Sequence, residues 1–165
     1  MEAKTLPVLL CSLGKHTQNK AFPQIPMIIY LAGPLFSEAK QAWHRATKAR
    51  IEAETGHTVI WPFELFDQAE IAKWGADAPR LVMEDCRDAL ATCDLVVALL
   101  DGAQVDDGTA WEIGYAHAKG IPVIGVRTDF RQAGDVPGAL VNAMVHASCQ
   151  VIVRSTDELL ERLKA

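Results

Sequence analysis

Apolar residues along the chain fall into short unbroken runs and into longer stretches with helical spacing. The unbroken runs cover residues 27–32, 58–61, 95–100, 122–126 and 150–153. Runs without polar alternation are typical of strands buried on both faces, as the strands of parallel sheets are. The pattern therefore predicts five buried strands.

Stretches with helical spacing separate these runs. The predicted helices cover residues 38–54, 80–92 and 109–119, with a last helix capped by Ser155 or Thr156. Gly56 and Gly120 close two of them, and short helical turns and loop are expected over 63–79. Because strands and helices alternate, we predict an α/β fold: a doubly wound parallel five-stranded sheet with helices on both faces.

Ligands of such sheets bind beyond the carboxyl ends of the strands, where the strand order reverses. Turn and polar residues occupy those ends here, at Gly33-Pro34, Trp61-Pro62, Asp101-Gly102 and residues 127–129. We expect these segments to rim one cleft.

Composition narrows the class of protein. A length of 165 residues fits one domain, and 50% hydrophobic with 22% charged residues fits a globular chain. The formal charge of −5 has the wrong sign for electrostatic binding of nucleic acid, and no apolar run is long enough for a membrane helix. We divide the chain into an N-terminal arm at 1–26, whose role stays open, and a domain at 27–165.

Metal and cofactor motifs are not found in the sequence. Its four cysteines form no Cys-x-x-Cys pair, its five histidines lack metal-ligand spacing, and there is no phosphate-binding G-x-x-x-x-G-K loop. We therefore expect reduced thiols, a cytoplasmic location, no metal and no cofactor.

Acidic residues and glycines are concentrated between residues 101 and 115. Thr109-Ala110-Trp111-Glu112 matches a capping box, in which Glu112 only satisfies a backbone N–H group. Alternatively, a carboxylate in the first turn of a helix stays ionised at the positive end of the dipole and faces the cleft as a nucleophile. Spacing alone leaves both interpretations open.

Three segments in register resemble the nucleoside 2-deoxyribosyltransferase family. They are Tyr30-Leu31-Ala32-Gly33-Pro34, residues 93–102, and the stretch from Asp106-Asp107-Gly108-Thr109 to Ala116. Asn142-Ala143-Met144 is a weaker match, and the resemblance covers roughly 27–160. It implies a flavodoxin-like architecture, the fold that the periodicity predicts.

The resemblance also implies a mechanism. Glu112 attacks the anomeric carbon of a 2-deoxyribonucleoside, the base departs, and a second base attacks the glycosyl ester, so that configuration is retained. Asp106 matches an acid of the family's base pocket and is assigned base binding and proton delivery. Its alternative role is that of an ordinary loop aspartate in an Asx-turn.

The sequence departs from the family at one position. In the helix before the central strand, where the family has an acid or amide, the register places Cys86. Asp85 or Asp88 would substitute after a small shift, but both are equally expected to be solvated helix charges.

Other candidate substrate contacts lie near strand ends. Gly33 permits close approach of a sugar or base to the backbone, or merely makes a tight turn. Tyr30 orients Glu112, contacts the sugar or packs in the core, and Trp61 and Phe63 either stack on a nucleobase or are buried in the core. The loop between residues 101 and 108 adds two further candidates, Asp101 and Gly108.

Asn142 has a different expected role. It resembles the family's asparagine that reaches the sugar in a neighbouring subunit's site, which implies a homo-oligomer; the alternative is an ordinary surface asparagine.

Three functions follow from these observations. The first is transfer of 2-deoxyribose between purine or pyrimidine bases in nucleotide salvage, with deoxyribonucleosides and free bases as partners. The second is N-glycosidic hydrolysis of nucleoside 5′-monophosphates, and the third is non-catalytic nucleoside or nucleotide binding. Leu35 and Phe36, the apolar residues just beyond the first strand, favour unphosphorylated substrates. The choice between purine and pyrimidine stays open.

Overall fold

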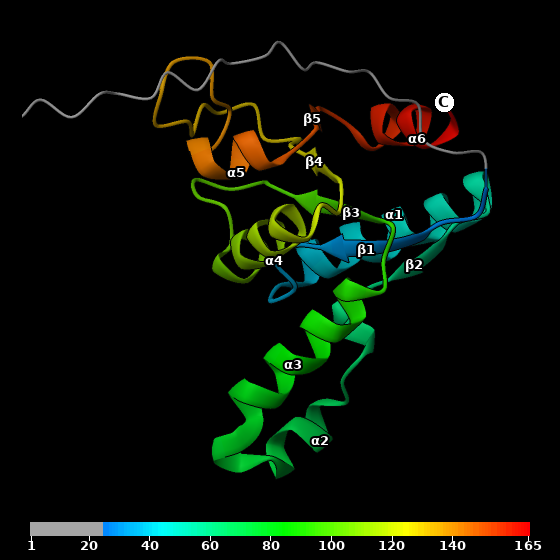
Figure 1. Ribbon diagram of the computed structural model, residues 1–165, viewed down its shortest axis with the longest axis vertical. Coiled ribbons are helices and arrows are strands. Elements are labelled where there is room, and N and C mark those ends of the chain that lie inside the picture. Colours follow the sequence, from blue (N-terminus) through cyan, green and yellow to red (C-terminus); the bar gives the residue numbers. More distant parts are fainter. Residues whose placement is uncertain (1–24) are drawn as a thin grey trace, which may run out of the picture.

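The computed structural model describes residues 25–165, so the expected N-terminal arm lies almost wholly outside the described residues. Five strands form one sheet: β1 (Ile28–Ala32), β2 (Thr58–Ile60), β3 (Leu95–Leu99), β4 (Val123–Val126) and β5 (Val151–Val153). All neighbouring pairs are parallel, and the order is β2-β1-β3-β4-β5 (Figure 1). The predicted five-stranded parallel sheet is therefore confirmed.

Helices and turns connect the strands. They are α1 (Glu38–Thr55), η1 (Pro62–Glu64), α2 (Gln68–Lys73), η2 (Gly75–Asp77), α3 (Ala78–Ala91), α4 (Asp107–Lys119), α5 (Ala143–Ser148) and α6 (Thr156–Lys164). Ser37 caps α1 and Ser155 caps α6 through side-chain oxygens, while Gly56 and Gly120 end α1 and α4 in the left-handed conformation. Among the described residues, none of the helices combines the length and apolarity needed to cross a bilayer.

Each face of the sheet has its own core. Ile29 and Leu31 of β1 point toward α1 and α6, whereas Tyr30 and Ala32 pack with residues of α3, α4 and α5 on the other face. Because helices cover both faces, every position of β3 is buried and its sequence cannot alternate with polar residues. Beyond this layered body, α2 and most of α3 extend away from the sheet (Figure 1).

A buried cation joins the loops that follow β3 and β4. The Arg127 guanidinium is fully buried and donates hydrogen bonds to the carbonyl oxygens of Leu100 (2.5 Å), Gly102 (3.2 Å) and Arg131 (2.9 Å). Beside it, the Asp101 carboxylate accepts from the backbone N–H groups of residues 128 and 129. The carboxyl ends of these two strands are therefore held together.

An aromatic stack supports the turn after β1. His44 of α1 is fully buried and stacks on Trp61, which in turn stacks on Phe63, with ring centroids 5.6 and 4.8 Å apart. Gly33 lies against this stack with φ +154°, and a Cβ added there would be 2.5 Å from Cε1 of His44. Only glycine fits without displacement.

We expect Gly33→Ala to lower the free energy of unfolding by about 2–4 kcal/mol, because the alanine adds both backbone strain and overpacking. Denaturant titration of this variant, of His44→Ala and of the double variant measures the effect. Because His44 supplies the clash, the double variant should lose less than the sum of the two single losses. Additive losses would contradict this account of the packing.

Candidate active site

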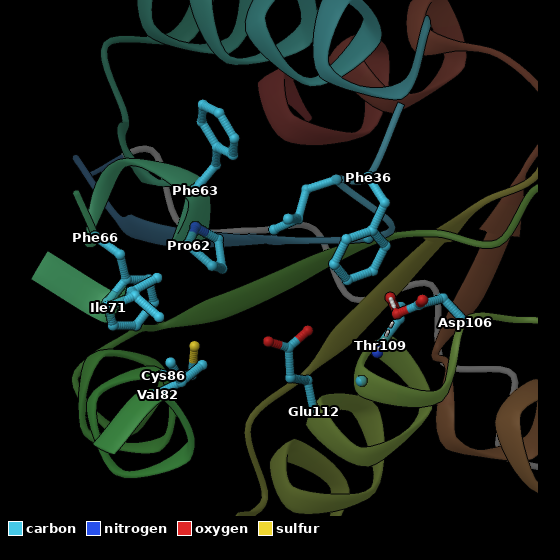
Figure 2. Close-up of a pocket in the computed structure, with 13 residues that line it drawn as sticks. Phe36, Pro62, Phe63, Phe66, Ile71, Val82, Cys86, Asp106, Thr109 and Glu112 are labelled. Atoms are coloured by element: carbon cyan, nitrogen blue, oxygen red, sulfur yellow. Dashed lines mark hydrogen bonds between the residues drawn. The ribbon is translucent and has the colours of Figure 1, made fainter. Parts of the chain in front are cut away.

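A cavity of about 310 Å³ opens at the carboxyl ends of β1 and β2, beside the N-terminal end of α4 (Figure 2). Much of its lining is apolar and comes from the turn after β1, from η1 and the segment that follows it, and from α2 and α3: Leu35, Phe36, Pro62, Phe63, Phe66, Ile71 and Val82. The rest is Gly33, Cys86, Asp106, Gly108, Thr109 and Glu112. A cavity of ligand size thus lies beyond the ends of two strands, where a ligand cleft was expected. Of the four segments expected to rim it, those after β1 and β2 line the cavity, whereas residues 101–102 and 127–129 do not, so that part of the prediction was wrong.

Glu112 is held in this cavity by a partner from the central part of the sheet. Tyr30 is fully buried in β1, and its hydroxyl group donates a hydrogen bond to Oε1 of Glu112 at 2.6 Å. Tyr30 faces α4 because alternate residues of β1 point to that side. Tyr30 therefore packs in the core and also orients Glu112, which are two of the roles expected for it, and its contact with the sugar stays a prediction.

Burial sets the charge state of this pair. Loss of hydration raises the pKa of Glu112 to about 7; the Tyr30 hydrogen bond opposes the rise, and the nearby Asp106 carboxylate adds to it. The pKa of Tyr30 is raised strongly by burial and then by Glu112, so its hydroxyl stays protonated and remains a donor. A carboxyl group titrating near neutrality in a cavity is typical of a catalytic centre.

The N-terminal end of α4 excludes the capping-box interpretation of Glu112. Asp106 is the N-cap, and its Oδ2 accepts hydrogen bonds at 3.0 Å from both the backbone N–H and the hydroxyl of Thr109. The helix therefore begins at Asp107, two residues earlier than predicted, and Glu112 lies beyond its first turn. The capping interpretation was wrong because Asp106, not Thr109, is the cap. The expected position of Glu112 in the first turn, at the positive end of the helix dipole, was wrong for the same reason.

Comparison with known families decides what kind of chain this is. A family model described as nucleoside 2-deoxyribosyltransferase matches residues 29–144. The chain belongs to this family. The resemblance inferred from the sequence motifs is confirmed, and the family supports a glycosyl-transferring enzyme of the nucleoside deoxyribosyltransferase type.

Solved structures show the same fold. A conserved protein from Enterococcus faecalis V583 has a TM-score of 0.69 and 30% identity, over 85% of this chain and 98% of that one. The 2-deoxyribosyltransferases of Bacillus psychrosaccharolyticus and Leishmania mexicana each have a TM-score of 0.62, with 24% and 23% identity. They cover 81% and 82% of this chain, and 90% and 98% of theirs. A comparison with curated proteins gave no match.

Within this 2-deoxyribosyltransferase domain, a thiol lines the cavity near Glu112. Burial, followed by the charge of Glu112, raises the pKa of Cys86 to about 11, so the group is a neutral thiol. Asp85 and Asp88 are exposed and do not line the cavity, and Asp88 instead accepts from Arg87 at 2.7 Å. The substitution of either aspartate for the family's acid or amide therefore has no geometric support.

The remaining sequence candidates divide into two groups. Gly33, Phe63 and Gly108 line the cavity together with Glu112 and Asp106.

Three other candidates lie outside the cavity lining. Trp61 is buried against Phe63, and Asp101 binds the backbone of the loop after β4. Asn142 caps α5, and its Nδ2 donates to Asp135 at 2.8 Å on the surface.

Several lining residues had no individual signal in the sequence. Phe66 and Ile71 lie in the stretch predicted as short helical turns and loop, whereas Val82 lies in the predicted helix over 80–92. All three line the cavity, which follows from the packing of α2 against α3. Among residues 25–165 there is no group of three histidine, cysteine or acidic side chains arranged to hold a metal ion.

The raised pKa of Glu112 implies a pH-dependent cost of folding. Its pKa is about 7 in the folded protein against an ordinary 4.5, so between these values the folded state binds more protons than the unfolded state. Stability attributable to this group therefore falls as pH rises from 4.5 to 7 and stays lower above that.

We expect Glu112→Gln, which keeps an acceptor for Tyr30, to raise the free energy of unfolding by up to about 3 kcal/mol at pH 8 and to give no such gain at pH 4.5. Urea titrations at the two pH values measure the difference. Glu161→Gln, at an exposed position on α6, is the control and should have the same small effect at both. An equal effect of Glu112→Gln at both pH values would contradict the assigned shift.

Proposed function

We propose that this protein transfers a 2-deoxyribosyl group between nucleobases by double displacement, through a covalent ester on Glu112. The observation that carries the proposal is the Glu112 carboxyl group, partly buried at a ligand-sized cavity and oriented by Tyr30. Membership of the 2-deoxyribosyltransferase family supports the reaction class. The partly buried, hydrogen-bonded carboxylate supports the role of nucleophile.

In the first step, ionised Glu112 attacks the anomeric carbon on the face opposite the base. A carbon–oxygen bond forms, the glycosidic carbon–nitrogen bond breaks, and its electron pair stays on the base nitrogen. Asp106 is the other carboxyl group that lines the cavity, and we assign it delivery of the proton to the departing base.

In the second step, a ring nitrogen of an incoming base attacks the same carbon and expels Glu112 as the carboxylate. The incoming base loses a proton, which returns to Asp106. Two inversions give net retention, as in retaining glycosidases. Tyr30 bonds only Oε1, which leaves Oε2 of the carboxylate for bond formation with the sugar.

Unphosphorylated deoxyribonucleosides are the proposed substrates. The turn beyond β1 places Leu35 and Phe36 at the cavity, and the Ser37 side chain caps α1 by accepting from the N–H of Lys40. These residues supply no cationic side chain to the cavity lining, whereas a 5′-phosphate is normally bound by charge-assisted hydrogen bonds.

We also propose that the active form is a homo-oligomer. Asn142 lies outside the cavity of its own chain and is exposed, next to the exposed Met144 on α5. These positions support a role for Asn142 at the sugar in a neighbouring subunit's site.

An exchange assay tests the proposed reaction. A 2-deoxyribonucleoside incubated with a second free base should give the exchanged nucleoside, whereas free sugar would indicate hydrolysis and unchanged substrate would indicate binding only. Glu112→Gln should lower the rate by about 10⁴-fold or more because it removes the nucleophile. Asp107→Asn, an exposed acid in the first turn of the same helix, is the matched control and should retain activity.

The covalent step has its own readout. Acid quenching during turnover, followed by mass spectrometry of the digested chain, should locate the sugar on Glu112. A sugar attached to another side chain, or undiminished exchange by Glu112→Gln, would refute the mechanism.

The pH dependence of kcat/KM reports the free enzyme's essential groups. Because Glu112 must be ionised and burial raises its pKa to about 7, kcat/KM should fall about tenfold for each pH unit below 7. Initial rates between pH 5 and 9 measure the profile. A flat profile down to pH 5 would show that a carboxylate with an unshifted pKa acts instead.

A further inference from the structure

The two ends of the active-site cavity differ in chemistry. Asp106 and Thr109 lie to one side of Glu112, and both carry hydrogen-bonding groups (Figure 2). To the other side lie Phe66, Ile71, Val82 and Cys86, which we call the apolar wall. Three of these four side chains have no hydrogen-bonding atom, and the Cys86 thiol is only a weak donor.

The apolar wall is not part of the protein's own core. Phe66, Ile71, Val82 and Cys86 are only partly buried, and they belong to neither of the two clusters that pack on the sheet. Their apolar surface is therefore available to a ligand. Phe66 also packs edge-to-face against Trp74, at the end of α2, with ring centroids 6.1 Å apart. This contact helps to hold the Phe66 ring in place.

The edge of an ordinary nucleobase suits this wall poorly. Exocyclic amino groups, ring nitrogens and carbonyl oxygens would lose hydrogen bonds to water and find no side-chain partner except the thiol. An apolar group at the same place would lose nothing and would bury hydrocarbon surface. Burial raises the pKa of the thiol to about 11, so Cys86 adds no charge that would attract a polar edge.

We propose that this enzyme prefers nucleobases that carry an alkyl or aryl substituent on the edge remote from the glycosidic nitrogen, with the substituent held by the apolar wall. The inference rests on the proposed function and names the substrate class of the same site. The substituent takes no part in bond making or breaking, so the two displacement steps are unchanged.

A competition experiment tests the preference. Equal concentrations of 2′-deoxyadenosine and its N6-propyl derivative are incubated with the protein and excess hypoxanthine, and consumption of each is followed by chromatography. The ratio of consumption gives the ratio of kcat/KM within one sample, and it is the same whether the sugar passes to a base or to water. At about fourfold per methylene buried, we expect the propyl compound to be favoured about tenfold or more, with N6-methyl intermediate.

Substitution of the wall should reverse the preference. Val82→Asn places an amide in the wall and should lower the propyl-to-unsubstituted ratio at least tenfold, and Ile71→Asn is a second variant should the first not fold. Met83→Asn, at the exposed neighbouring position on α3, is the matched control and should leave the ratio unchanged. Because both substrates compete in one sample, a change in the ratio cannot come from a smaller active fraction.

The outcomes separate the two proposals. If both nucleosides are consumed and the propyl compound is not preferred, or if Val82→Asn leaves its preference intact, the apolar-wall inference is overturned, whereas cleavage of the glycosidic bond at this site is retained and the exchange assay decides the reaction. If neither nucleoside is consumed but a pyrimidine 2-deoxyribonucleoside is, the inference is overturned for purines and the proposed function stands. If no 2-deoxyribonucleoside of either class is consumed, the proposed function fails and this inference fails with it.

Discussion

The hydrogen bond between Tyr30 and Glu112 is the contact on which the candidate site depends. It joins residues 82 positions apart, one in a strand buried on both faces and the other in the helix that follows β3. A carboxyl group removed from water needs such a partner, because an unpaired buried charge is costly. The partner in turn requires a rigid strand, which the two covering layers of helices provide.

The residues that stabilise the fold and the residues that line the cavity are largely different. Hydration lost by Glu112 weakens the folded state near neutral pH, while the cores on both faces of the sheet offset that loss. The wall formed by α2 and α3 adds little to either core and leaves apolar surface at the cavity. The apolar residues that line the cavity on this side thus lie outside the two cores.

Much of the fold was predictable because it follows from local patterns. The strands were recognised from unbroken apolar runs, and Glu112 and Asp106 from a motif at the start of one helix. The competition between Asp106 and Thr109 for the cap was not predictable, since both side chains are good caps and only the backbone geometry selects one. Nor was the place of Phe66 and Ile71, because it depends on how two helices pack rather than on periodicity.

Arg127 connects the loop that leads to Asp106 with the loop that follows β4. Its guanidinium bonds carbonyl oxygens of two loops, and one of those loops continues from Gly102 to Asp106. The conformation of the loop that carries Asp106 therefore depends on residues outside that loop. Transplanting it into another parallel sheet requires the arginine and the second loop as well, and insertions in either loop are tolerated only where the shared cation keeps its carbonyl partners.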